Sequence, residues 1–414
     1  LRWADSSYSW RSFRGSRQRP NTSSRASVVS VGVVAIRFAM TIRTQRYIID
    51  PPAACPRHLR THRGLPGQTV PLDIDLVARC AWGEILQTAP GSTSLFGFLE
   101  DLLEPGPSLT WRAQGPGRGT EMRRAFSGLF GRFFARAYLQ EHHGFVWFTA
   151  IDGDNFMLSP RWRIRRKRGA TTEMPDWICA RPGELAIAEA KGSHQKGNAT
   201  RGGVPGPIKT ALGQITGVRV EKLTHHRAGS RRRWISKSVK GWAVMSRWGL
   251  ATPFRAPFLY ALDPETEGEV LSDGEKDHLI QAVARTHLAQ TAEGLGLIKT
   301  DLNYESEIVA APRRRVRVGD DPSGRHFLGG VVTPFGLLDL DLDQAKALAG
   351  HLPDPRLVQF VGLEESLFRA LIQSERIDPL QATQIGQAAR LGADGLAVAA
   401  VTDIVDEGYK DMSV

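Results

Sequence analysis

Cysteine is scarce in this sequence, and the cysteines present are not arranged for a metal site or a disulfide framework. Only Cys55, Cys80 and Cys179 occur among 414 residues. They form no CxxC pair and no Cys/His cluster with zinc-site spacing, which argues against the common zinc-binding modules. An odd number of widely separated cysteines is typical of a reducing compartment, so we expect a cytoplasmic protein.

Long apolar runs and phosphate-binding glycine loops are also missing. The apolar stretch at residues 28–36 is about half of the ~18 residues that a membrane-spanning helix needs, so we expect no membrane partner. Residues 1–39 contain no Met and are rich in Arg and Ser, and we expect a disordered upstream extension with the natural start at Met40. Without a Walker-type loop, nucleotide hydrolysis would need a separate partner.

Acidic residues are in deficit, with 43 Asp and Glu against 54 Lys and Arg and a formal net charge of +11. Such an excess favours a polyanionic partner. Arg and Lys bind phosphates, and Trp residues interleaved with them can stack on unpaired bases. The alternative is that such basic runs are solvated loops with incidental charge. The residues that we expect to contact nucleic acid are Arg163, Arg165, Arg166, Lys167, Arg231, Arg232 and Arg233.

Hydrophobic periodicity predicts alternating helices and strands, which indicates an α/β or α+β fold. The expected helices are 76–86, 121–139, 208–223, one opened by a capping box at Ser272, 344–348, 363–372 and 381–391. The expected strands are 145–151, 176–180, 184–191, 241–245, 258–262 and runs within 328–342. Asp339, Asp341 and Asp343 alternate with Leu, and we interpret them as a solvated strand edge.

The most informative segment runs from Met174 to Lys191. Pro182-Gly183 lies between two short apolar runs and predicts a turn, because Pro fixes φ and Gly accepts a positive φ. If the turn has two residues, Asp176 lies directly opposite Glu189, with Cβ atoms roughly 5 Å apart. A slip of one residue would put the two carboxylates on opposite faces of the hairpin.

Two facing carboxylates repel each other unless a positive charge lies between them. A divalent cation with oxygen ligands resolves this conflict, and Mg²⁺ typically takes one or two carboxylates together with substrate phosphate. Strand alternation places Lys191 on the same face as Glu189, where its ammonium can stabilise negative charge in a transition state. These groups are the minimum set for hydrolysis of a phosphodiester.

Pro175-Asp176, followed by Glu189-Ala190-Lys191 at the end of a short apolar strand, resembles the PD-(D/E)XK nuclease superfamily over roughly residues 120–262. The resemblance implies a restriction-endonuclease-like core with a mixed β-sheet flanked by helices. It implies that Asp176 and Glu189 bind Mg²⁺ or Mn²⁺ and that Lys191 assists the attacking water. It further suggests Glu121 as an acidic residue on the first helix and Gln214 as a polar residue on the helix after the lysine.

The resulting hypothesis is a metal-dependent deoxyribonuclease, in bacterial defence, restriction or mobile-element biology. DNA is the expected partner, while RNA, a second copy of the chain and a partner subunit stay open. The alternatives are a nucleic-acid-binding protein that keeps the fold without catalysis, or a basic scaffold protein. The expected organisation is an extension at 1–39, an N-terminal accessory region at 40–115, a nuclease core at 116–262, a helical connector at 263–318 and a smaller C-terminal α/β domain at 319–414.

Overall fold

The computed structural model describes most of the chain between residues 42 and 410. The described residues are 42–49, 69–88, 104, 110–112, 115, 119–194, 205–224, 233–250, 257–299, 309–310, 313–318, 323–333, 336–338, 340–352, 358–385 and 389–410. The extension expected at 1–39, the start expected at Met40, and Arg231 and Arg232 lie outside these ranges.

A mixed seven-stranded sheet forms the centre of the region around the predicted hairpin, with the strand order β2-β1-β13-β11-β8-β7-β4. Its strands are β1 (Ile42–Ile49), β2 (Thr69–Asp73), β4 (Trp147–Ala150), β7 (Trp177–Arg181), β8 (Glu184–Ser193), β11 (Lys240–Arg247) and β13 (Phe258–Leu262). The pairs β8/β11 and β1/β13 are parallel, and the other pairs are antiparallel. The sheet therefore includes β1 and β2, from the region expected to be a separate accessory segment.

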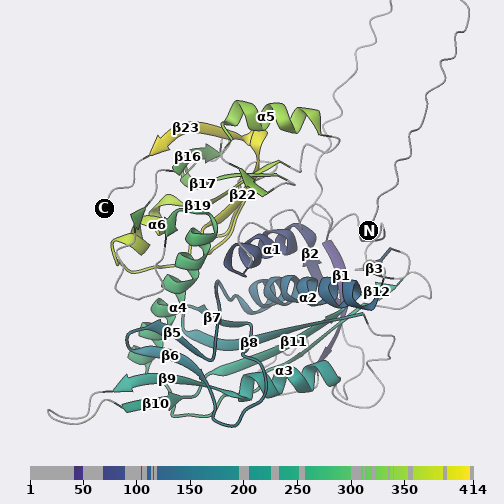
Figure 1. Ribbon diagram of the computed structural model, residues 1–414, viewed down its shortest axis with the longest axis vertical. Coiled ribbons are helices and arrows are strands. Elements are labelled where there is room, and N and C mark those ends of the chain that lie inside the picture. Colours follow the sequence, from purple (N-terminus) through teal and green to yellow (C-terminus); the bar gives the residue numbers. More distant parts are fainter. Residues whose placement is uncertain are drawn as a thin grey trace, which may run out of the picture. The chain divides into compact units, whose positions relative to one another are not determined.

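Helices cover both faces of this sheet (Figure 1). They are α1 (Ile74–Thr88), α2 (Thr120–His143), α3 (Gly206–Thr216) and α4 (Asp273–Gly294). Alternation along the strands explains the two layers, because successive side chains point to opposite faces. Trp177 and Cys179 share one apolar cluster with α1 and α2, while Ile178 and Ala180 share the other with α3 and α4.

A second, four-stranded sheet with the order β10-β9-β6-β5 carries one of the basic runs. Its strands are β5 (Asn155–Ser159), β6 (Trp162–Arg166), β9 (Val218–Thr224) and β10 (Arg233–Lys237). The helix expected over 208–223 was too long, since α3 stops at Thr216 and the chain continues as β9. The cause is non-local: the alternating residues from Val218 onward pair with β6.

The C-terminal part contains an eight-stranded sheet whose described strand pairs are all antiparallel, together with two helices. Its strands are β16 (Arg313–Val318), β17 (His326–Thr333), β18 (Gly336–Leu338), β19 (Gln359–Glu364), β20 (Thr383–Ile385), β21 (Ala389–Leu391), β22 (Leu396–Ala400) and β23 (Ile404–Lys410). The helices are α5 (Leu342–His351) and α6 (Glu365–Ile372), with a 3₁₀ turn at Val401–Asp403. Two-stranded pairs complete the described elements: β3 (Thr110–Trp111) with β12 (Gly249–Leu250), and β14 (Ile298–Lys299) with β15 (Val309–Ala310).

Two expectations for this C-terminal part were wrong. The described residues of 381–391 contain the strands β20 and β21 and not a helix. β21 pairs with the following strand β22, which is itself paired with β19, and this sheet pairing outweighs local periodicity. Asp341 and Asp343 do not line a strand edge either, and Asp339 lies outside the described residues. Asp341 is the N-cap of α5, where its carboxylate accepts the backbone N–H of Gln344 at 2.6 Å. Asp343 lies in the first turn of the same helix, where a negative charge is favourable.

The expected fold class is confirmed at the level of a mixed α+β protein with several sheets and six α-helices among the described residues. The capping box of Ser272 and Glu275 opens α4 as expected. No helix in the described ranges is both long enough and apolar enough to cross a membrane.

Helix α2 crosses the end of β8 at unusually short range, and two glycines make this possible. A Cβ atom on Gly131 would lie 2.4 Å from the backbone nitrogen of Gly192. A Cβ atom on Gly192 would lie 1.4 Å from the carbonyl oxygen of Ser127. The crossing therefore fixes the position of α2 over the strand that carries Glu189 and Lys191.

We expect Gly131→Ala to destabilise the protein by about 1–3 kcal/mol, because an added methyl group overpacks the helix–strand crossing. Gly128→Ala is the matched control on the same helix, since a Cβ atom there meets no atom within 4 Å. That change should stabilise the protein by up to about 1 kcal/mol through helix propensity. Chemical denaturation of the two variants measures both values, and equal effects would contradict the close crossing.

Candidate functional site

The predicted hairpin is present in the expected register. Strands β7 and β8 pair with Trp177 opposite Ala188 and Arg181 opposite Glu184, so the turn consists of Pro182 and Gly183. Gly183 has a φ of 78°, which explains the need for glycine at this position. The register continues one residue beyond β7 and brings Asp176 beside Glu189.

Each of the two carboxylates accepts a backbone N–H from the opposite side of the hairpin. The Asp176 N–H donates to Glu189 Oε2 at 2.8 Å, and the Ala190 N–H donates to Asp176 Oδ2 at 2.7 Å. Each acid thus uses one carboxylate oxygen to hold the neighbouring strand. The second oxygens, Asp176 Oδ1 and Glu189 Oε1, are left to meet positive charge.

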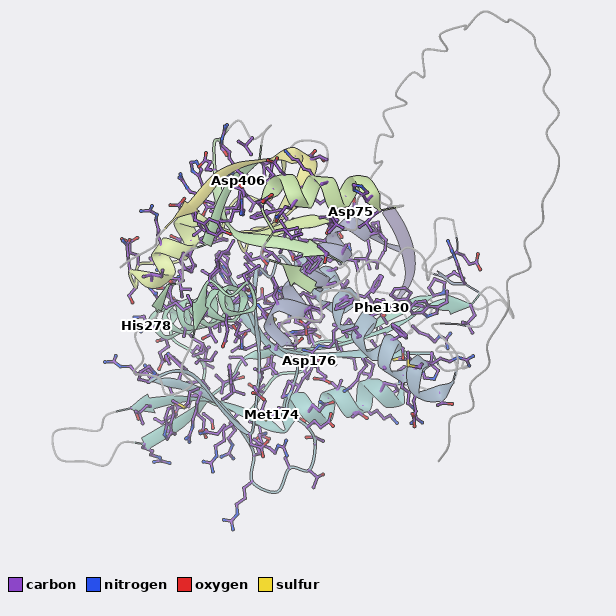
Figure 2. The ribbon with its side chains drawn as sticks, turned by 45° about the horizontal axis from the view of Figure 1, so that its top comes forward. Asp75, Phe130, Met174, Asp176, His278 and Asp406 are labelled. Atoms are coloured by element: carbon purple, nitrogen blue, oxygen red, sulfur yellow. The ribbon has the colours of Figure 1, made fainter. Side chains whose placement is uncertain are left out.

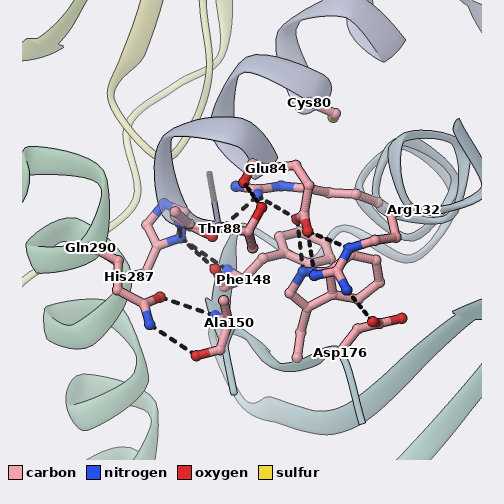
Figure 3. Close-up of polar contacts among 12 residues, drawn as sticks. Cys80, Glu84, Thr88, Arg132, Phe148, Ala150, Asp176, His287 and Gln290 are labelled. Atoms are coloured by element: carbon pink, nitrogen blue, oxygen red, sulfur yellow. Dashed lines mark hydrogen bonds and ion pairs between the residues drawn. The ribbon is translucent and has the colours of Figure 1, made fainter. Parts of the chain in front are cut away.

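Each of these second oxygens is bound to a cationic side chain. The Lys191 ammonium donates to Glu189 Oε1. Asp176 Oδ1 accepts from Nη1 of Arg132, which lies on α2 (Figure 3). Figure 2 shows Asp176 among the packed elements of the molecule, and in the sequence it directly precedes β7. The structure therefore brings Asp176, Glu189 and Lys191 together and adds Arg132, which the sequence analysis had not singled out.

A third carboxylate, Glu84 of α1, holds the other side of the Arg132 guanidinium. Glu84 is fully buried, and its Oε1 accepts from Nε of Arg132 at 2.5 Å and also contacts Nη2. Its Oε2 accepts the indole N–H of Trp177 at 2.8 Å and lies 3.4 Å from Nη1 of Arg136 (Figure 3). One guanidinium thus bridges Glu84 and Asp176.

The network of alternating charges continues beyond Glu84 to the turn before β22. Nη2 of Arg136 lies 3.9 Å from Oδ2 of Asp394, and Nη1 of Arg79 lies 3.1 Å from Oδ1 of the same residue. Nε2 of His287 lies 3.7 Å from Asp394 Oδ2. Burying an unpaired charge costs much free energy. The pairing of acidic with basic side chains therefore allows several charged residues to be buried beside the site.

Burial dominates the electrostatics of the carboxylate pair. It raises the pKa of Asp176, against the opposing effect of Arg132. Burial, reinforced by the charge of Asp176, raises the pKa of Glu189 to about 8, although Lys191 opposes the shift. Burial thus disfavours the charged form of both acids, and an additional positive charge at the pair would favour that form.

The other two residues expected in the catalytic group lie further out. The amide of Gln214 on α3 donates to the Met174 carbonyl oxygen at 3.2 Å, so it holds the chain two residues before Asp176. Glu121 is exposed in the first turn of α2, roughly 16 Å along the helix axis from Arg132. The helix-borne acid next to Asp176 is instead Glu84, which comes from the region expected to be accessory.

A local signal for the missed residues exists in the sequence. Glu84 interrupts the apolar run from Cys80 to Leu86, and Arg132 and Arg136 interrupt the phenylalanine stripe one helical turn apart. A charge on the buried face of a helix needs a partner of opposite sign. This rule flags Glu84, Arg132 and Arg136 as a set, but it cannot say which element supplies each partner.

The donor chemistry of the pair suits a hard divalent cation. Asp176 Oδ1 and Glu189 Oε1 are carboxylate oxygens from neighbouring strands, and both already bind positive charge. Mg²⁺ is typically held by one or two carboxylates, with water or substrate oxygens completing the shell. Within the described ranges, no group of three or more His, Cys, Asp or Glu side chains forms a metal site.

The basic residues expected to bind nucleic acid differ in their availability. Arg163 pairs with Glu221 and lies 4.0 Å from the centre of the Trp234 ring. Arg166 pairs with Asp154 at 2.8 Å, and Lys167 pairs with Glu267 at 2.9 Å. Arg233, at the start of β10, is exposed.

Arg165 is exposed on β6 and lies directly opposite Arg219 of β9, which is also exposed. Like charges directly opposite each other across a strand pair are unfavourable. Alternation along β6 puts Arg163 on the same face as Arg165. This face of the four-stranded sheet is therefore the most cationic part of the expected set.

Comparison with models of protein families, with curated proteins and with solved structures gave no match to this chain.

The raised pKa of Glu189 predicts a pH-dependent difference in stability between the wild type and Glu189→Gln without metal. Below about pH 4.5 this carboxyl is protonated in both folded and unfolded chains. Between pH 4.5 and 8 the unfolded chain releases the proton and the folded chain keeps it, so wild-type stability falls by up to about 1.4 kcal/mol per pH unit. Glutamine has no such loss.

Urea unfolding in a chelator at about pH 5 and about pH 8 measures this difference. We expect Glu189→Gln to gain stability relative to the wild type at the higher pH. A difference that stays constant, or that moves in favour of the wild type, would show that Glu189 ionises freely in the folded protein.

Proposed function

We propose that this chain is a metal-dependent nuclease of the PD-(D/E)XK type that hydrolyses DNA phosphodiester bonds. The observation that carries the proposal is the convergence of Asp176, Glu189 and Lys191 across one β-hairpin, where both acids have raised pKa values. Perturbed acids of this kind are typical of functional sites. We also propose that the protein works in the cytoplasm, in bacterial defence, restriction or mobile-element biology.

Asp176 and Glu189 would hold Mg²⁺ or Mn²⁺ through Oδ1 and Oε1. The bound ion would supply a polarised phosphate and a more acidic water molecule. The backbone N–H groups of Asp176 and Ala190 orient the two carboxylates by binding their other oxygens. Lys191 presents its ammonium beside Glu189, where it can stabilise negative charge on the attacking oxygen or on the phosphate. Gln214 fixes the chain that leads into Asp176.

The second part of the proposal is that the cationic face of the four-stranded sheet binds the DNA backbone. Arg165 and Arg219 are the residues whose mutual repulsion a phosphate would relieve. Arg233 lies opposite Thr224 of β9, so strand alternation puts it on the other face of the sheet. Positive charge also lies near the end of β8, where burial, together with Arg123 and Arg124, lowers the pKa of His194. Contacts of this kind bind phosphate without sequence preference.

We expect purified wild-type protein to cleave plasmid DNA with Mg²⁺ or Mn²⁺ and to lose activity in a chelator. Lys191→Ala should reduce the rate at least about 100-fold, because it removes charge stabilisation in the transition state. Lys346→Ala, at an exposed position on α5, is the matched control and should cleave at the wild-type rate. DNA binding without cleavage in any of the three proteins would favour a catalytically inactive binding protein.

For the cationic face, we expect Arg165→Ala combined with Arg219→Ala to weaken DNA binding. The slope of log K against log salt should fall by roughly two, because two phosphate contacts are lost. Fluorescence anisotropy over a salt series measures this slope, with Lys346→Ala again as the control. An unchanged slope would assign the DNA contacts to another surface, and absence of salt-sensitive binding in the wild type would favour a scaffold role.

A further inference from the structure

The Arg132 guanidinium binds the carboxylate oxygen of Asp176 that a metal cation would need as a ligand. It donates through Nη1 to Asp176 Oδ1, the same oxygen that faces away from the backbone of β8. Its side chain is 27% exposed, whereas the side chain of Glu84 is fully buried. A divalent ion approaching Asp176 would therefore compete with Arg132 for one oxygen and would be repelled by its charge.

Glu84 provides a second carboxylate with which Arg132 can stay paired when it releases Asp176. Nε and Nη2 of Arg132 already lie on Glu84 Oε1, so this pairing needs no help from Asp176. The Trp177 indole and Arg136 hold the other oxygen of Glu84, and Arg136 is in turn held near Asp394. Glu84 is thus fixed in position, and Arg132 can release Asp176 without leaving an unpaired guanidinium.

We propose that Arg132 is an internal counter-ion of Asp176 that a divalent cation displaces onto Glu84. In the metal-free protein Arg132 is the positive partner of Asp176 Oδ1. When the cation binds, Asp176 exchanges one positive partner for another and Arg132 pairs with Glu84 alone. The strength of the Glu84–Arg132 pair thereby sets the metal affinity. This inference rests on the proposed function, because it assumes that the cation binds at Asp176 and Glu189.

A simpler view is that Arg132 acts only through the electric field of its charge. Both views expect Arg132→Gln to bind metal more tightly. They differ for Arg132→Lys, which keeps the charge but replaces the planar fork with a single ammonium that cannot span two carboxylates in the same way. Displacement predicts tighter metal binding in Arg132→Lys than in the wild type, whereas the field alone predicts no change.

The test is calorimetric titration of Mn²⁺ alone into the wild type, Arg132→Lys, Arg132→Gln, Glu84→Gln and the double variant Arg132→Gln/Glu84→Gln. We expect Arg132→Lys to bind Mn²⁺ at least about threefold more tightly, and Arg132→Gln about tenfold. Glu84→Gln should weaken binding in the wild-type background, because Arg132 then has only Asp176. The same change should have a clearly smaller effect in the Arg132→Gln background.

Equal effects of Glu84→Gln in both backgrounds, or wild-type affinity in Arg132→Lys, would overturn the displacement. Circular dichroism establishes which variants fold. If the Gln variants do not fold, the comparison of Arg132→Lys with the wild type decides the question. Asp176→Asn separates the two proposals. If Asp176→Asn loses Mn²⁺ binding but Arg132→Lys binds Mn²⁺ with wild-type affinity, only the displacement is overturned. A wild type that binds no Mn²⁺ overturns the metal site and the displacement together.

Discussion

Two acids side by side, one buried and one largely buried, cannot both carry their charge unless positive charge reaches them, and much of the described structure around β7 and β8 meets this requirement. The hairpin brings Asp176 and Glu189 together, and the backbone N–H groups of each strand bind one oxygen of the opposite acid. Lys191 and Arg132 then bind the remaining oxygens. The pKa values of both acids nevertheless stay raised, mainly because they are buried. A site with this residual need for positive charge is suited to a divalent cation.

The second layer of charge explains why residues far apart in the sequence are needed around one hairpin. Glu84 pairs with Arg132 and Arg136, and Asp394 pairs with Arg79 and lies near Arg136. Removing one member would leave a buried partner uncompensated, which is far more costly than losing an exposed ion pair. The turn before β22 therefore contributes to the surroundings of an acid that lies more than two hundred residues earlier in the chain.

The sequence predicts local features of this site well and long-range features poorly. The turn at Pro182-Gly183 depends on the φ preferences of two adjacent residues, and it fixes the register that brings Asp176 to Glu189. Glu84 and Arg132 belong to separate helices, so only the three-dimensional packing of α1 on α2 pairs them. The same reason accounts for the end of α3, where the distant strand β6 pairs with the residues that follow. For β20 and β21 it is the adjacent strand β22, itself paired with β19, that overrides the helical periodicity. The basic run around Arg165 was recognised from composition, but its free and paired members could be separated only with the sheet in view.

The most direct test of the account is a crystal structure with Mn²⁺, using the anomalous signal of the metal to locate it. The account expects one anomalous peak in contact with Asp176 Oδ1 and Glu189 Oε1, with the Arg132 guanidinium bound to Glu84 only. Absence of a peak at this position, with Arg132 still joining Glu84 and Asp176, would contradict it and leave the buried charges as a purely structural network.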